Sequence, residues 1–274
     1  MELRGRVAVV TGGGGGIGEG LCRAFAAGGA RAVVVADIDG DAAERVAKDI
    51  DAAASGGTRA LGLRVDAGSE PDVVALVART EEEFGPVDLF CANAGIIAVG
   101  GVEVADDVWE RMWRVNVASH IYAARAVLPA MLARGEGYLL HTASAAGLLT
   151  QLGSAPYSVT KHAVVGLTEW LAITHGDSGV RFSCLCPQAV ATAMTGGARA
   201  SVGEGGVEST AGRDGILSPA QVAATVVEGL RDERFLILPH PEVATYEQRR
   251  AGDRERWLRG MRRVQAATVA AWRG

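Results

Sequence analysis

The 274-residue sequence predicts an α/β fold: a single doubly wound domain on a seven-stranded parallel sheet flanked by helices. Three features support this prediction: seven short apolar runs, helix-length segments between them, and a glycine-rich turn after the first run. Apolar runs without alternation are typical of parallel strands that helices cover on both faces. We find no interdomain linker and no internal repeat, so residues 1–240 are expected to form one domain and residues 241–274 its helical extension.

The expected strands share short length and β-branched or apolar composition, and most are bounded by charged, glycine or proline residues. They are Arg6–Val10, Ala32–Ala36, Arg59–Val65, Asp88–Ala92, Tyr138–His141, Val180–Cys186 and Phe235–Leu238. Amphipathic spacing places helices between them, and Ser69 followed by Pro71 is typical of a helix start. The expected helices are Ile17–Ala27, Asp41–Ala54, one beginning near Ser69, Asp106–Ala133, Ala155–His175 and Pro219–Leu230.

Composition narrows the class of protein. Lys and Arg total 27 and Asp and Glu total 32, so the net charge is −5, which argues against a nucleic-acid partner. The four cysteines lie in apolar segments and are expected to be buried, reduced thiols. The first residues do not resemble a signal peptide, and the longest uncharged run is too polar to span a membrane. We therefore expect a cytoplasmic protein with no membrane partner.

Two segments differ from this pattern. A stretch rich in Gly, Ser and Ala predicts a substrate loop at about residues 188–217. The tail carries eight Arg and four acidic residues, and its apolar residues recur at roughly helical spacing. We expect an amphipathic helix there that packs on the body or on a neighbouring subunit.

A glycine-rich turn, Thr11-Gly-Gly-Gly-Gly-Gly-Ile-Gly18, joins the first expected strand to the first expected helix. A sharp turn, close approach to a pyrophosphate and tight helix–strand packing each exclude a β-carbon. The helix that follows directs its free N–H groups and its positive dipole end toward the phosphates. The motif therefore predicts a dinucleotide site of the Rossmann type.

Asp37 ends the second expected strand, nineteen residues after Gly18. A carboxylate at this place can accept hydrogen bonds from the adenosine ribose hydroxyls, and it repels a 2′-phosphate. Neither the glycine turn nor Ile38 offers a positive charge that would neutralise such a phosphate. The sequence thus favours NAD over NADP.

Tyr157 and Lys161 are four residues apart in an expected helix and therefore share one face. Ser144 ends the fifth expected strand. A nearby ammonium and a positive nicotinamide would lower the pKa of the phenol, so that Tyr157 could accept the proton of an alcohol while Ser144 holds its oxygen. Lys161 is one of only two lysines in the chain.

These residues together resemble the short-chain dehydrogenase/reductase family over about residues 5–240. The resemblance rests on the glycine turn, Asn93-Ala94-Gly95, Asn116, Ser144 and Tyr157-x-x-x-Lys161. It implies that Asn116 joins the catalytic set, with its helix kinked around a water that links Lys161 to solvent. It also implies a homodimer or homotetramer built through the helices that carry Asn116 and Tyr157.

Together with the glycine turn and Asp37, the contacts that the resemblance implies complete the set of expected cofactor residues. These are Gly12, Gly16, Ile17, Gly18, Asp37, Ile38, Asp66, Ala67, Asn93, Ala94, Gly95, Tyr157, Lys161, Pro187, Val190 and Thr192. The family usually has Pro-Gly where this chain has Pro187-Gln188, which places a side chain near the nicotinamide. With Ser144 and Tyr157, Gln188 and Gln151 are the expected substrate contacts.

These expectations describe an NAD-dependent oxidoreductase that transfers a hydride between a secondary alcohol and its ketone. The surrounding apolar residues favour a hydrophobic or cyclic small-molecule substrate, although Arg199 or Arg213 could reach an acid. One alternative is an NADPH-dependent biosynthetic reductase similar to a ketoacyl reductase. Another is a nucleotide sensor without catalysis, since a fold does not fix a function. We expect no metal site, because no histidine has a ligand partner at useful spacing.

Overall fold

The structure is a computed structural model that describes residues 1–53, 57–195, 212 and 214–273. Its single sheet has seven parallel strands in the order β3-β2-β1-β4-β5-β6-β7. The strands are β1 (Val7–Thr11), β2 (Ala32–Asp37), β3 (Arg59–Arg64), β4 (Leu89–Ala92), β5 (Gly137–Thr142), β6 (Val180–Leu185) and β7 (Leu236–Ile237). All seven strands predicted from the sequence are present, so the doubly wound fold is confirmed.

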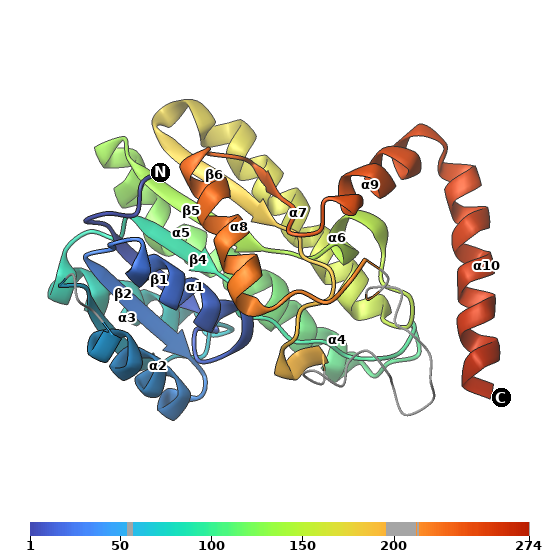
Figure 1. Cartoon of the computed structure of the whole chain (residues 1–274), viewed down its shortest axis with the longest axis horizontal. Coiled ribbons are helices and arrows are strands. Elements are labelled where there is room, and N and C mark those ends of the chain that lie inside the picture. Colours follow the sequence, from blue (N-terminus) through green and yellow to red (C-terminus); the bar gives the residue numbers. More distant parts are fainter. Residues whose placement is uncertain (54–56, 196–211, 213, 274) are drawn as a thin grey trace.

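Helices cover both faces of this sheet (Figure 1). One face packs against α1 (Gly16–Ala27), α2 (Gly40–Ala53) and α8 (Pro219–Arg231), and the other against α3 (Glu70–Phe84), α5 (Ser119–Arg134) and α7 (Ala155–His175). Alternate residues of β1 divide between these two cores: Ala8 and Val10 enter the first, and Val7 and Val9 the second. Burial on both faces explains why the strands are apolar throughout.

The strand order reverses between β1 and β4, which start crossovers to opposite faces. In open α/β sheets, ligands bind at the carboxyl ends of the strands beside such a reversal. The glycine turn follows β1, and Asn93 follows β4. The topology therefore places these two sequence motifs at one crevice.

Serine caps fix the start of three helices. Ser69, Ser154 and Ser218 each accept a hydrogen bond from a backbone N–H of the first turn, and a proline stands at the first or second helical position. Such a cap typically stabilises a helix by about 1 kcal/mol. The cap predicted at Ser69 is confirmed.

The segment predicted as one helix from Asp106 to Ala133 is three elements instead. The helix α4 (Asp106–Trp113) is followed by a π-helical turn, Arg114–Ala118, and then by α5. A π turn inserts an extra residue per turn without changing the apolar pattern around it, so periodicity alone did not reveal it. A short helix, α6 (Ala146–Leu149), was also not predicted.

The tail forms two helices, α9 (Glu242–Gly252) and α10 (Arg254–Arg273). Val243 of α9 is fully buried in a small core with Leu148, Val164 and Cys184. By contrast, α10 stands away from the body, as Figure 1 shows. The tail therefore packs on the body through α9, and packing of α10 on a neighbouring subunit, the other alternative, stays a prediction.

Gly18 and Gly15 offer a matched test of packing at the start of α1. A β-carbon on Gly18 would lie 2.0 Å from the Gly12 carbonyl oxygen, whereas one on Gly15 would meet nothing within 4 Å. Overpacking costs about 1–3 kcal/mol, so Gly18→Ala is expected to lower the Tm by several degrees. Gly15→Ala should leave the Tm of the free protein almost unchanged. Calorimetry on both variants checks this, and equal Tm values would contradict the packing argument.

Candidate active site

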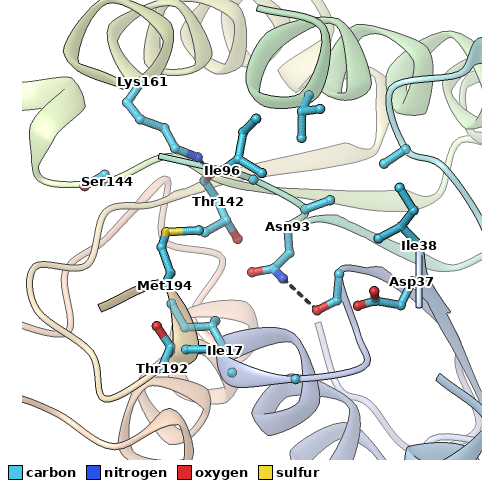
Figure 2. A pocket seen from close by; sticks show the side chains of 18 of the residues that line it. Ile17, Asp37, Ile38, Asn93, Ile96, Thr142, Ser144, Lys161, Thr192 and Met194 are labelled. Carbon is cyan, nitrogen blue, oxygen red and sulfur yellow. Dashed lines mark hydrogen bonds between the residues drawn. The ribbon is translucent and has the colours of Figure 1, made fainter. Parts of the chain in front are cut away.

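A cavity of about 620 Å³ opens at the carboxyl ends of the strands. Figure 2 shows its two ends: Asp37 and Ile38 lie at one, Ser144 and Lys161 lie at the other, and Asn93 lies between them. The cavity is therefore long enough to bring the predicted ribose contact and the predicted catalytic residues into one space. This length suits an extended ligand better than a small one.

The glycine turn forms one wall of the cavity. Gly12 and Gly16 have φ angles of +66° and +53°, a conformation that side chains rarely adopt. No side chain caps the start of α1 at Gly15, so its first N–H groups are left for another acceptor. A cradle of glycines under an uncapped helix start fits the phosphates of a dinucleotide.

Asp37 is held in place by two backbone donors. Its Oδ2 accepts from the Gly14 N–H at 2.9 Å and its Oδ1 from the Asp39 N–H at 3.0 Å. A carboxylate has about four acceptor positions, so it can also accept from ligand hydroxyls in the cavity. Ile38 beside it is 64% exposed.

Two arginines near Asp37 were missed by the sequence analysis. Arg45 donates to the Gly14 carbonyl at 2.9 Å and pairs with Glu19 and Asp49. Arg64 lies opposite Asp37 on the neighbouring strand β3. Neither follows Asp37 closely in the sequence, so only the strand pairing and the α2 packing could reveal them.

Asp66 and Ala67, the expected adenine contacts, line the cavity beyond β3, and Arg111 and Arg114 also line it. The Asp66 carboxylate accepts from the Gly68 N–H at 2.8 Å, and a β-carbon on Gly68 would lie 3.1 Å from the Arg114 side chain. The two arginines therefore bring positive charge to this part of the wall. No sequence signal had marked them, because their helical pattern is that of ordinary surface residues.

Asn93 ties β4 to the glycine turn. Its side-chain nitrogen donates to the Thr11 carbonyl at 3.0 Å, and its backbone N–H donates to the Thr11 hydroxyl at 3.0 Å. The Ala94 N–H donates to the same hydroxyl at 3.2 Å. The three bonds hold the two strand ends at a fixed separation below the cavity.

Asn116 lies in the π turn and is fully buried. Its side chain accepts from the Ile96 N–H at 2.8 Å and donates to the Ile96 carbonyl at 2.9 Å and to the Thr160 hydroxyl at 3.2 Å. It thus joins the loop after β4 to α7, next to Lys161. The π turn gives a structural basis for the kink that the family resemblance implied.

Lys161 is buried, and its Nζ donates to the Thr142 carbonyl at 2.9 Å. Burial lowers the pKa of this ammonium to about 8, although the Cys184 and Cys186 thiols oppose the change. Its Nζ lies 5.7 Å from the centre of the Tyr157 ring. The structure thus places the predicted pair together on one face of α7.

Tyr157 and Ser144 line the same end of the cavity. The Ser144 hydroxyl accepts from the Ala146 N–H at 3.1 Å and points its own proton toward the Pro187 carbonyl, 3.4 Å away. Burial raises the pKa of Tyr157, and a hydrogen bond with Ser144 only partly offsets this rise. The lowered pKa expected from the sequence is therefore not found in the chain by itself. A lowered pKa of Tyr157 would require further positive charge in the cavity.

His120 and His141 are a fully buried pair. Their Nδ1 atoms lie 2.9 Å apart, so one ring donates to the other. Burial lowers both pKa values, that of His141 to about 4, which keeps the pair neutral beside Lys161. Among the described residues, no group of three or more His, Cys, Asp or Glu side chains is arranged to hold a metal.

Most of the predicted contacts lie on the cavity wall, but three do not. Gly18 and Asn116 lie behind the wall, and the Gln151 amide instead donates to the Leu152 carbonyl. The predicted loop is described only in part, since residues 196–211 and 213, with Arg199 and Arg213, lie outside the described residues. Lining residues that the sequence analysis missed include Val65, Ile96, Val115, Thr142, Ala143 and Met194.

The sequence pattern of the short chain dehydrogenase family matches residues 6–203. The chain belongs to the short-chain dehydrogenase family. It is therefore an oxidoreductase that acts on hydroxyl or keto groups of small molecules, in a family that binds nicotinamide cofactors. No helix in the described part of this short-chain dehydrogenase is long and apolar enough to cross a membrane.

Named relatives and a solved structure agree with this assignment. The chain is 37% identical to 1-deoxy-11-beta-hydroxypentalenate dehydrogenase of Streptomyces exfoliatus, over 88% of this chain and 86% of that protein. It is 33% identical to 3beta-hydroxysteroid dehydrogenase 2 of Eggerthella lenta, over 81% and 86%. A short-chain dehydrogenase/reductase from Burkholderia phymatum, solved in complex with NAD, superposes with a TM-score of 0.82 at 33% identity, over 93% and 96%.

The burial of Lys161 should make the free protein less stable at neutral pH. The folded chain carries a buried charge below its pKa of about 8, whereas the unfolded lysine stays charged up to its ordinary 10.5. Lys161→Met is therefore expected to raise the free energy of unfolding at pH 7 by about 1–3 kcal/mol. This gain should shrink as pH rises from 8 toward 10.5, because wild type then releases the proton on folding.

Urea unfolding of wild type and variant at several pH values measures the difference. The other lysine, Lys48, is exposed and pairs with Glu44, so Lys48→Met is the matched control and should change little. A loss of stability in Lys161→Met at pH 7 would show that the bond to Thr142 outweighs the cost of burying the charge.

Proposed function

We propose that the enzyme oxidises a hydrophobic secondary alcohol to its ketone with NAD, or catalyses the reverse reduction. The observation that carries this proposal is the single cavity with Ser144, Tyr157 and Lys161 at one end and Asp37 at the other. Hydride transfer to a dinucleotide requires an acid–base group and a residue that binds the ribose of the nucleotide, both in the same cavity. When bound, the oxidised nicotinamide supplies the hydride acceptor and a positive charge.

Each catalytic side chain has a distinct part in the proposal. Ser144 donates a hydrogen bond to the substrate oxygen and turns it toward Tyr157. The Tyr157 phenolate then takes the hydroxyl proton as the C–H bond breaks. Lys161 stabilises the phenolate by its charge and binds the nicotinamide ribose, and Asn116 holds a water through which the proton leaves.

The remaining predicted contacts are assigned to the cofactor. The glycine turn with Ile17 receives the pyrophosphate, Asp37 and Ile38 the adenosine ribose, and Asp66 and Ala67 the adenine. The middle of the cofactor is supported by Asn93, Ala94 and Gly95. The nicotinamide end is held by Pro187, Val190 and Thr192. Of the cofactor contacts predicted by residue, Gly18 alone is not among the described cavity-lining residues, and it supports the turn from within α1.

The walls near Ser144 favour an apolar substrate. Ile96, Ala143 and Met194 line this end, with Gln188 as a polar residue among them. Pockets of this kind bind an apolar body and orient it through a few polar groups. The named relatives act on a pentalenate and a hydroxysteroid, which supports a cyclic hydrophobic alcohol as the substrate class.

An NADPH-dependent biosynthetic reductase is the second candidate. The observation that favours it is Arg64, which lies opposite Asp37 and could face a 2′-phosphate. We prefer NAD because the fixed Asp37 carboxylate would repel that phosphate, and because Arg45 is already paired with Glu19 and Asp49. A sensor without catalysis would not need the full set of Ser144, Tyr157, Lys161 and Asn116.

We further propose a homodimer or homotetramer that forms through the outer faces of α5 and α7. The support is an exposed apolar stripe on α7: Val159 is 49% exposed, Trp170 58% and Ile173 85%. These residues are spaced so that they share one side of the helix. Exposed apolar area of this kind commonly marks a protein interface.

Replacing Tyr157 by Phe removes the proton acceptor and keeps the ring. We expect kcat/KM for alcohol oxidation to fall at least about a hundredfold, the scale of general acid–base catalysis. NAD should still raise the Tm of the variant, because the cradle and Asp37 are unchanged. Tyr122→Phe, on half-buried Tyr122 of α5, is the control. Retained turnover in Tyr157→Phe would refute the proposed role of the tyrosine.

Cofactor choice is tested by thermal unfolding with NAD⁺, NADH, NADP⁺ and NADPH. NAD(H) is expected to raise the Tm of wild type more than NADP(H) does. In Asp37→Ser the ratio of the Kd for NADP(H) to the Kd for NAD(H) should fall at least about tenfold, because the repulsion between Asp37 and the 2′-phosphate is lost. Asp41→Ser removes the same charge from an exposed position at the start of α2, and it should leave the preference for NAD(H) over NADP(H) unchanged. A larger shift of wild type with NADP(H) would instead support the second candidate.

A further inference from the structure

Two buried histidines behind the catalytic end of the cavity are joined by one hydrogen bond. His120 of α5 and His141 of β5 are both 0% exposed, and their Nδ1 atoms lie 2.9 Å apart. The outer Nε2 atom of each ring has no hydrogen-bond partner among the described residues. Burying two polar rings for a single bond gains little stability, so the pair calls for another role.

The two rings lie on the two segments that meet at the buried lysine. His141 directly precedes Thr142, whose carbonyl accepts from Lys161 Nζ at 2.9 Å. His120 follows Asn116 by four residues, about one helical turn, and Asn116 lies in the π turn before α5. The bond between the rings therefore ties the segment of Asn116 to the strand whose last carbonyl holds the lysine.

The side chains of Lys161 and Asn116 meet beside Gly95. A β-carbon on Gly95 would lie 3.4 Å from Lys161 Nζ and 3.4 Å from Asn116 Oδ1. The ammonium is thus set between the end of β5 and the π turn, and a change in their separation would move it. Its Nζ lies 5.7 Å from the centre of the Tyr157 ring, so such a movement alters the field at the phenol.

The strand β5 is the fixed member of this arrangement, because it pairs with β4 on one side and β6 on the other. The π turn interrupts the regular bonding between α4 and α5, and helices bend at such interruptions. The side-chain bonds of Asn116 reach Ile96 and Thr160, in the loop after β4 and in α7. The histidine pair adds the link to β5.

The pair suits a place beside an ammonium because it stays uncharged. Burial lowers the pKa of both rings, that of His141 to about 4, and the charges of His141 and Lys161 lower the pKa of His120 further. The other titratable groups around the ammonium in the described part of the chain are the catalytic phenol and the Cys184 and Cys186 thiols. Two neutral rings thus join the segments without adding a second buried charge.

We propose that His120 and His141 are a positioning pair for the catalytic lysine. The bond between them holds the π turn against β5, so that the ammonium of Lys161 stays directed at Tyr157. This inference rests on the proposed alcohol oxidation, in which that ammonium stabilises the phenolate. Neither ring lines the cavity, so the pair acts through Lys161 and not on substrate or cofactor.

The test changes the bond in three ways. His141→Leu removes one partner, and the double variant His120→Leu with His141→Leu removes both, which leaves no buried polar ring unpaired. His141→Asn keeps a polar amide atom where the ring has Nδ1. The control is His175→Leu, at the half-buried last residue of α7.

The main readout is the pKa of Tyr157, followed by the ultraviolet absorbance of its phenolate in the free protein and with saturating NAD⁺. Tyr157→Phe is the blank, because it removes this phenol and keeps the other tyrosines. The free energy of unfolding in urea and the pH profile of kcat for cyclohexanol oxidation are measured beside it. The absorbance readout holds whether or not cyclohexanol is oxidised.

We expect the pKa of Tyr157 with NAD⁺ to rise by at least about one unit in His141→Leu and in the double variant. In His141→Asn and His175→Leu it should change by less than about 0.3 unit. The acid limb of the kcat profile should move to higher pH by the same amounts. The free energy of unfolding should fall in His141→Leu and largely recover in the double variant, whereas the pKa of Tyr157 should not recover.

A Tyr157 pKa that recovers together with stability in the double variant would show a packing role alone and overturn the positioning pair. An unchanged pKa in both Leu variants, with alcohol still oxidised, would defeat the pair and leave the proposed function standing. If His141→Leu does not fold, the double variant and His141→Asn decide on the same readout. If NAD⁺ raises the Tm of wild type but Tyr157 titrates no lower than about 10 and no alcohol is oxidised, both proposals fail.

Discussion

The contact between the start of α1 and the end of β1 is the constraint on which the rest of the site depends. Gly18 lies so close to the Gly12 carbonyl that no β-carbon fits, and this lets the helix begin directly above the strand. Asn93 then fixes β4 to the same turn through the Thr11 carbonyl. With both strand ends set, the crevice between β1 and β4 has a defined width, and the uncapped start of α1 faces into it.

Burial of charge has opposite effects on stability and on catalysis at the other end of the cavity. Desolvation lowers the pKa of Lys161 and raises that of Tyr157, so each change disfavours the ion pair in the chain by itself. The neutral His120–His141 pair avoids adding a second buried positive charge. The protein thus holds a poorly solvated proton acceptor and a costly ammonium, an arrangement that a positive ligand in the cavity would relieve.

The parts of this structure that the sequence predicts are those fixed by local pattern. Strands buried on both faces read as continuous apolar runs, and the glycine turn requires glycine at fixed places, so the fold and most of the cavity wall could be predicted. The place of Arg64 beside Asp37 and that of Arg114 on the cavity wall could not, because they depend on strand register and on the turn after α4 and not on local pattern. The π turn at Asn116 was missed for a related reason: one extra residue in a turn leaves the surrounding periodicity intact.

The two halves of the cavity draw on different parts of the chain, and this explains why the cofactor half was easier to predict. The nucleotide side is built by strand ends and turns between Gly12 and Asn116, where each residue type answers a geometric need. The substrate side depends on segments far along the chain: His240 holds Gln188, and Tyr246 of α9 donates to Asp214 at 2.9 Å. Gln188 and Asp214 both belong to the segment expected to form the substrate loop, so His240 and α9 hold the two ends of that segment. Local pattern can predict a turn or a strand end, but it cannot predict which distant residue, such as His240 or Tyr246, will hold the substrate side.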